Sequence, residues 1–135
     1  MNAFIVELVN QAGQLAKASE ALAQKGINIE GFSGVSVGGG GAVVFVTNDE
    51  AGTRRALLDA GFRAREIELV TATLDHKPGS LAAAARKLAD AGINIEAAMP
   101  IGMAGDKVSV AFATDQPAKA RSLIGSKEAT GIGIG

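Results

Sequence analysis

The sequence repeats itself with a constant offset of 66 residues. Residues 10–30 read NQAGQLAKASEALAQKGINIE, and residues 76–96 read HKPGSLAAAARKLADAGINIE. The glycines Gly13 and Gly79 match at this offset, as do Glu30 and Glu96, with no insertion between them. A regular repeat indicates a duplicated structural unit. We therefore expect two domains, residues 1–66 and 67–135. Units this small are marginal alone, so we expect them to pack as an intrachain pseudo-dimer and the chain to form a homodimer.

Each half predicts the same order of strands and helices. In the first half, alternating apolar residues over 4–9 predict a strand, and apolar residues at helical spacing predict a helix over 14–25 that ends at Gly26. Two strands, 27–37 and 42–47, follow around a reversal at Gly38–Gly41. A helix capped by Asn48 or Asp49 should then run to about Ala60.

The second half follows the same plan. It predicts a strand over 70–74, a helix over 80–91, strands over 93–103 and 107–113, and a helix from Asp115 or Gln116 to about Ile124. Residues 127–135, KEATGIGIG, should supply a last strand or a tail. Around Glu66 the apolar positions change phase, which predicts a bend or bulge where the two halves join.

The order strand, helix, strand, strand, helix, strand defines a fold class. It is the βαββαβ or ferredoxin-like arrangement of α+β proteins. We expect each half to form an antiparallel sheet with both helices on one face.

Composition excludes several functions. The net charge is −1 and the chain has no Tyr or Trp, so a nucleic-acid partner is not expected. There is no apolar run of about 20 residues that could cross a membrane and no signal-peptide pattern. The chain has no Cys, which removes disulfides and thiolate chemistry. We expect a cytoplasmic protein.

Few residues could perform catalysis. His76 is the single histidine, and nothing in the pattern brings a serine to it as a nucleophile. A zinc site would need several His or Cys, while Glu30 and Glu96 read best as solvated strand residues. A phosphatase using backbone amides and arginine ranks last, because the arginines do not lie in a Gly-rich strand-to-helix turn. We expect no enzyme activity, cofactor or metal.

The glycine run Gly38–Gly41 is better explained as a hairpin than as a phosphate loop. It lacks the Lys-Ser/Thr pair that follows a phosphate loop, and it joins two strands instead of opening a helix.

The two strand-to-helix turns, residues 10–15 and 76–81, are the candidate ligand sites. The first N–H groups of a helix have no partner within the helix and carry partial positive charge, so such a turn can hold a carboxylate. A glycine there lets a ligand approach the backbone. The alternative is that Pro78 and Gly79 only shape a tight turn, and the residues alone favour neither reading.

The motifs HKPGSL…AGINI and NQAGQL…KGINI, each between strands of a βαββαβ unit, resemble the ACT domain. The resemblance covers both halves and implies a regulatory module that binds amino acids at an interface between two ACT units. It places the turn of one unit against the Asn that follows the first helix of the other. The candidate ligand-binding residues are Asn10, Gln11, Ala12, Gly13, Gln14, Leu15, Asn28, Ile29, His76, Lys77, Pro78, Gly79, Ser80, Leu81, Asn94 and Ile95.

The first turn departs from this pattern because Ala12 stands where Pro78 stands in the second. If one site is competent, we expect it at residues 76–81. Apolar residues near the turns, including Met99, favour a small or branched aliphatic amino acid. The alternative for His76 is a solvated position in the loop. The alternative for Asn28 and Asn94 is a turn or edge-strand residue whose side chain hydrogen-bonds its own backbone. The competing hypothesis is a module that docks onto a metabolic enzyme and binds no ligand.

Overall fold

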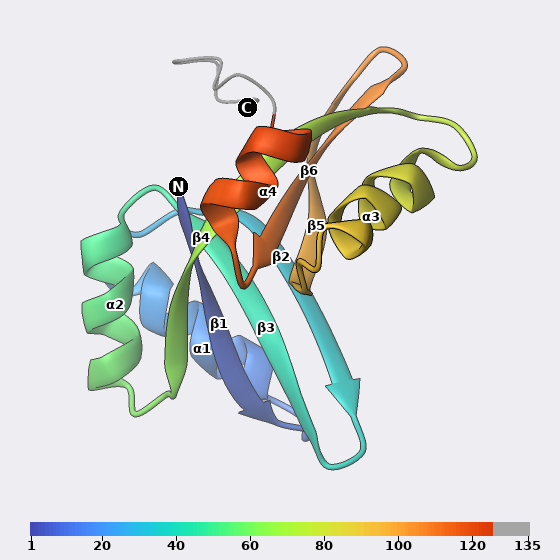
Figure 1. Ribbon diagram of the computed structural model, residues 1–135. Coiled ribbons are helices and arrows are strands. Elements are labelled where there is room, and N and C mark those ends of the chain that lie inside the picture. Colours follow the sequence, from blue (N-terminus) through green and yellow to red (C-terminus); the bar gives the residue numbers. More distant parts are fainter. Residues whose placement is uncertain (126–135) are drawn as a thin grey trace. The chain divides into compact units, whose positions relative to one another are not determined.

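The computed structural model describes residues 1–125 of the 135-residue chain. It divides into two compact units, one of residues 2–67 and one of Met1 with the chain from Glu68 onward. We call them the first and second units. A single strand, β4 (Ala64–Asp75), supplies residues to both (Figure 1).

In the first unit, four strands and two helices alternate in the predicted order. The strands are hydrogen-bonded in the order β2-β3-β1-β4. The β1–β3 and β2–β3 pairs are antiparallel. The further elements are β1 (Asn2–Val9), α1 (Gln14–Ala23), β2 (Ile29–Val37), β3 (Gly40–Thr47) and α2 (Glu50–Asp59).

The second unit has the same plan, with its strands in the order β4-β6-β5. Both of these pairs are antiparallel, so the predicted α+β class with antiparallel strands is confirmed. The fourth strand that we predicted within residues 127–135 lies outside the described residues. The further elements are α3 (Ser80–Asp90), β5 (Ile95–Ala104), β6 (Lys107–Thr114) and α4 (Pro117–Ile124).

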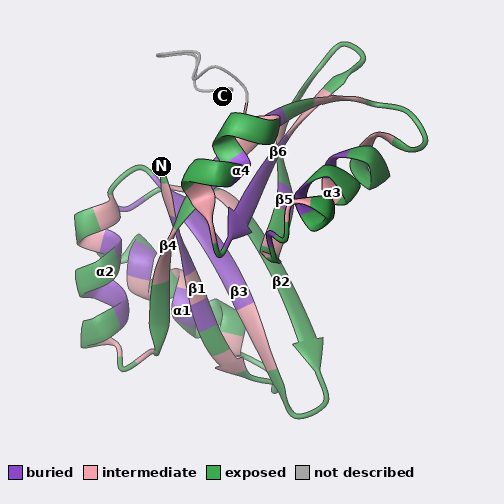
Figure 2. Cartoon of the chain, in the orientation of Figure 1, coloured by how far each residue is buried: buried purple, intermediate pink, exposed green. Residues whose placement is uncertain are grey.

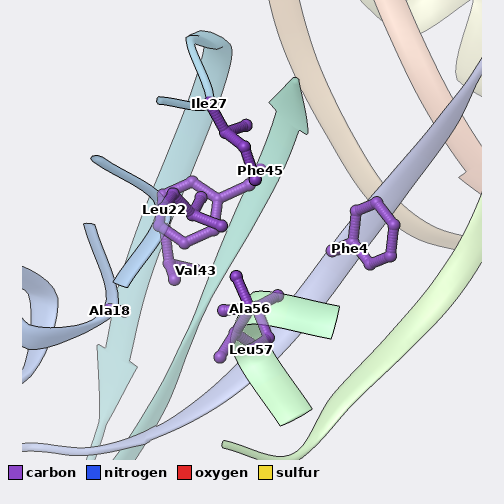
Figure 3. Packing of buried hydrophobic residues seen from close by; sticks show 9 residues of the cluster. Phe4, Ala18, Leu22, Ile27, Val43, Phe45, Ala56 and Leu57 are labelled. Carbon is purple, nitrogen blue, oxygen red and sulfur yellow. The ribbon is translucent and has the colours of Figure 1, made fainter. Parts of the chain in front are cut away.

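Each unit buries one sheet face under both of its helices. In the first unit, Phe4 of β1 lies opposite Phe45 of β3, and both pack with Leu22 of α1 and Leu57 of α2 (Figure 3). The second unit repeats this packing with Val70, Phe112, Leu88 and Ala120. Figure 2 shows the consequence for the helices, which are buried on one side and exposed on the other.

The cap of α2 is the one predicted at Asp49. Its side chain accepts a hydrogen bond from the Gly52 N–H at 2.9 Å, which satisfies one of the free donors at a helix start. The other predicted cap, Asn48, instead accepts from the Asn28 N–H at 3.0 Å. At α4, Gln116 takes the cap position without a side-chain bond, and Pro117 follows.

Of the bend or bulge predicted near Glu66, the bulge is wrong. The Leu69 N–H donates to Met1 O at 2.9 Å and the Glu7 N–H donates to Arg63 O at 3.0 Å, and these two bonds fit one register with no extra residue. The apolar phase changes because β4 is buried on both faces, at Leu69 and at Val70.

The strands after α1 and α3 begin two residues later than predicted. Ile27 donates its N–H to Leu22 O at 3.1 Å, and Ile93 donates to Leu88 O at 2.9 Å. Both isoleucines are buried core residues. Each therefore closes the preceding helix instead of opening the strand. The helices end correspondingly early, at Ala23 and Asp90.

Candidate functional site

The turn between β4 and α3 leaves helix donors free. Gly79 has a φ of 90° and opens α3 without a side-chain cap. The Ser80 N–H makes a long bond of 3.4 Å to Lys77 O. Within the described residues, the next two amides, of Leu81 and Ala82, donate to no protein acceptor. These N–H groups carry the positive end of the helix dipole and can receive an anion.

A pocket of about 270 Å³ lies beside this turn, entirely within the second unit. Its floor is the helix-covered face of the sheet, and its wall is the start of α3. Most of the lining is apolar, with charged groups only from the turn and from the end of β4. The lining residues are Leu74, Asp75, His76, Lys77, Ser80, Leu81, Ala98, Met99, Pro100, Val108 and Val110.

The first unit has an equivalent pocket of about 340 Å³. Leu8, Leu15 and Val43 line it where Leu74, Leu81 and Val110 line the other. The full lining is Leu8, Val9, Asn10, Gln11, Gln14, Leu15, Phe32, Gly34, Val35, Ser36, Gly41, Ala42 and Val43. The two halves therefore share a pocket as well as a turn.

The two pockets differ in polarity and in one wall. The rim of the second carries Asp75, His76 and Lys77, where the first has Val9, Asn10 and Gln11. At the outer strand, Phe32 of the first pocket stands where the second has Ala98. The second pocket is thus the ionic one, and it lacks the ring that occupies part of the first.

Charged hydrogen bonds fix the rim of the second pocket. Lys107 Nζ donates to Asp75 Oδ1, and Lys77 Nζ lies 3.8 Å from Asp75 Oδ2. The hydrogen bond from Lys107 lowers the pKa of Asp75 below its ordinary value, and the same bond raises the pKa of Lys107. Asp75 therefore stays ionised at neutral pH and is paired with both lysines.

This pairing predicts a pH-dependent contribution to stability. Because the pKa of Asp75 is lower in the folded state, its contribution is present above its unfolded value of about 3.9 and is lost as the pH falls through the folded value. We expect Asp75→Asn to lower the melting temperature at pH 7 and to have a progressively smaller effect as the pH falls below the unfolded pKa of about 3.9. The measurement is thermal unfolding from pH 2 to 8. Lys107→Met should show the same loss at pH 7, and an Asp75→Asn effect unchanged in acid would contradict this account.

The structure brings together eight of the predicted site residues, four in each pocket. The other members of the turns do not line them. Pro78 and Gly79 instead line a larger hollow of about 630 Å³, which the end of α4 also lines. Ala12 and Gly13 do not line the first pocket. The eight residues in the pockets are Asn10, Gln11, Gln14, Leu15, His76, Lys77, Ser80 and Leu81.

The predicted asparagines lie at the opposite end of their helices from the turns. The Asn94 N–H donates to Asp115 Oδ1 at 2.9 Å, as the Asn28 N–H does to Asn48. A helix of ten residues spans about 15 Å, so no single unit brings its own turn and its own Asn together. Ile29 and Ile95 pack against the cores of their units and line neither pocket.

Sequence reasoning missed most of the pocket floor. Asp75 and the strand residues Leu74, Ala98, Val108 and Val110 were not predicted, although Met99 was. The strand residues share one face of the sheet because of the pairing register. This register sets Ala98 opposite Phe112 and Pro100 opposite Val110 on the helix-covered face. The alternation of each strand was visible in the sequence, but the register between strands was not.

Two further features bear on function. Within residues 1–125, no three His, Cys, Asp or Glu side chains gather as a possible metal site. No helix in the same range is long and apolar enough to span a membrane.

Comparison with known proteins identifies part of the chain. Residues 3–59, from β1 to the end of α2, match the ACT domain family. The ACT resemblance is thus confirmed for that segment, which includes the first turn and its pocket. No curated protein matches the sequence.

Solved structures share the fold over nearly the whole chain. Protein BT0572 from Bacteroides thetaiotaomicron is 22% identical, with a TM-score of 0.74 over 90% of this chain and 84% of that one. The regulatory subunit of aspartate kinase from Thermus flavus is 20% identical, with a TM-score of 0.61 over 90% and 89%. That from Thermus thermophilus, in a ligand-free form, is 18% identical, with a TM-score of 0.59 over 90% and 88%. At these identities the likeness concerns the fold.

Proposed function

We propose that this protein is a non-enzymatic regulatory protein that binds a small amino acid at the turn of residues 76–81. The observation that carries the proposal is the recurrence of one pocket at both strand-to-helix turns. The ACT match over residues 3–59 supports the class of ligand, since ACT domains are regulatory modules that bind amino acids. The structural similarity to aspartate kinase regulatory subunits agrees with a regulatory role.

The chemistry of the second pocket suits an aliphatic amino acid. The free amides of Leu81 and Ala82, with Lys77 nearby, would hold the carboxylate. Asp75 would attract the ammonium group. The apolar floor formed by Leu74, Val108 and Val110 would take the side chain, and its volume of about 270 Å³ leaves room for a branched aliphatic group.

The proposal includes a wall from another ACT unit. Asn28 and Asn94 are exposed at the far ends of their helices, and in this proposal each closes a site formed by the turn of a different unit. A ligand held across two units would favour one packing of those units over another. That difference in affinity is how such a module could transmit a signal.

We expect Ala98→Phe to abolish binding, because it places in the second pocket the ring that the first unit carries at Phe32. The sheet accepts this ring at the equivalent position, so the variant should fold. Isothermal titration calorimetry with each of the twenty amino acids would measure affinity for the wild type and the variant. The matched control is Ala89→Phe, which adds the same ring at an exposed position of α3.

The outcomes separate three accounts. Heat from one chemical class of amino acid, lost in Ala98→Phe and kept in Ala89→Phe, supports the proposal. Binding that survives Ala98→Phe would move the site away from this pocket. No heat with any amino acid would overturn the proposal and favour the docking module.

A further inference from the structure

One carboxylate at the rim of the second pocket already has ammonium partners from the chain itself. Asp75 lines the pocket, and Lys107 Nζ donates to its Oδ1. Lys77, which lines the same pocket, has its Nζ 3.8 Å from the other oxygen of Asp75. Among the described residues that line this pocket, Asp75 is the only carboxylate. The ammonium group of a ligand that enters the pocket therefore meets a carboxylate that is already paired.

This pairing follows from the strand register, and the first unit does not have it. The register of β4 and β6 sets Asp75 opposite Lys107, and side chains at opposite positions of an antiparallel pair lie close together. In the first unit, the last residue of β1 is Val9, which lies opposite Gly40. The second unit thus carries a rim carboxylate together with a cation that competes for it.

The pair between Asp75 and Lys107 is open to exchange. The side chain of Lys107 is 50% exposed and that of Asp75 is 44% exposed, and exposed ion pairs contribute little net free energy. A second carboxylate also acts on the lysine. The pKa of Lys107 is raised chiefly by the hydrogen bond to Asp75 and to a smaller degree by the charge of Asp106. Water and Asp106 would therefore still stabilise Lys107 after a ligand has taken Asp75.

We propose that Lys107 competes with the ammonium group of a bound amino acid for Asp75, and so lowers the selectivity of the site for amino acids over carboxylic acids that lack an amino group. This inference rests on the proposed function. The free amides of Leu81 and Ala82 would hold a carboxylate whether or not the ligand has an amino group. The amino group adds affinity only to the extent that its contact with Asp75 is stronger than that of Lys107.

The ratio of two dissociation constants tests the inference. Isothermal titration calorimetry at neutral pH would measure the Kd of alanine, valine and leucine, and of the matching acids propionate, isovalerate and isocaproate. Lys107→Met keeps an unbranched side chain and removes the ammonium group. We expect it to raise the ratio of the acid Kd to the amino-acid Kd about fivefold, the scale of a partly exposed ion pair. Because both compounds carry a carboxylate, the lost attraction between that carboxylate and Lys107 cancels in the ratio.

Matched variants separate this competition from a general charge effect. Lys87→Met removes the same charge from an exposed position of α3 that does not line the pocket, and it should leave the ratio unchanged. Lys107→Arg keeps the cation and should keep the wild-type ratio. Adding Asp75→Asn to Lys107→Met should abolish the gain. If circular dichroism shows that Lys107→Met does not fold, Lys107→Gln replaces it, because glutamine keeps a hydrogen-bond donor without the charge.

The outcomes distinguish this inference from the proposed function. A ratio that rises in Lys107→Met and returns to the wild-type value in Lys107→Arg supports the competition. An unchanged or lower ratio in Lys107→Met, with amino-acid binding retained, would overturn the inference and leave the proposed function standing. No heat with any of the three amino acids, in the wild type or in Lys107→Met, would overturn both.

Discussion

Replacing Leu57 with alanine is expected to lower the free energy of unfolding by about 2–5 kcal/mol. Leu57 lies on α2, is fully buried, and packs in the first-unit core with Phe4 and Phe45 (Figure 3). Its removal costs the transfer of the side chain and leaves a cavity that a packed core closes only in part. Urea unfolding followed by circular dichroism measures the loss.

The adjacent residue supplies the control. Leu58 is on the same helix and 71% exposed, so Leu58→Ala removes the same atoms from a site in water. We expect a change within about 0.5 kcal/mol, and alanine has the higher helix propensity. Similar losses in the free energy of unfolding for Leu57→Ala and Leu58→Ala would show that α2 does not pack against the core through the face that carries Leu57.

Replacing Gly79 with alanine is expected to destabilise the chain by about 1–2 kcal/mol, because an L-residue is strained in the left-handed region. The φ of Gly79 is 90°, and a Cβ there would meet no atom within 4 Å. The cost is therefore conformational, not steric. The variant should also weaken amino-acid binding, because the strain falls on the turn that positions the free amides of α3.

A glycine in another turn gives the comparison. Gly39 also has open space where a Cβ would lie, but its φ is not in the left-handed region. Gly39→Ala should be neutral or stabilising by up to about 1 kcal/mol, because alanine lowers the conformational entropy of the unfolded chain. Equal melting temperatures for Gly79→Ala and Gly39→Ala would contradict the strained turn.

The sequence predicted what depends on local pattern. The order of elements over residues 1–125 and the two strand-to-helix turns follow from spacing within short segments, and the structure has them. Of the bend or bulge predicted near Glu66, the bulge was wrong because a phase change in apolar residues has two causes, an inserted residue or a strand buried on both faces. Burial of Leu69 beside Val70 depends on residues distant in the sequence, so the local pattern could not distinguish them.

Only the part of the candidate site that lies within one continuous segment of the sequence could be predicted. The turn residues His76, Lys77, Ser80 and Leu81 reach the pocket directly from their motif. The floor of the pocket comes from β5 and β6, where the register between strands decides which residues share a face. Asp75 was missed because its importance lies in its hydrogen bond to Lys107, which is 32 residues away.

The most direct test of the account is a thermal-unfolding screen of the wild-type chain against the twenty amino acids. The chain has no Trp or Tyr, so circular dichroism or an external dye would follow unfolding. A ligand at 100 times its Kd should stabilise the fold by about 2.7 kcal/mol, a rise of several degrees. The account predicts this rise for one class of aliphatic amino acid. An unchanged melting temperature with all twenty would contradict it.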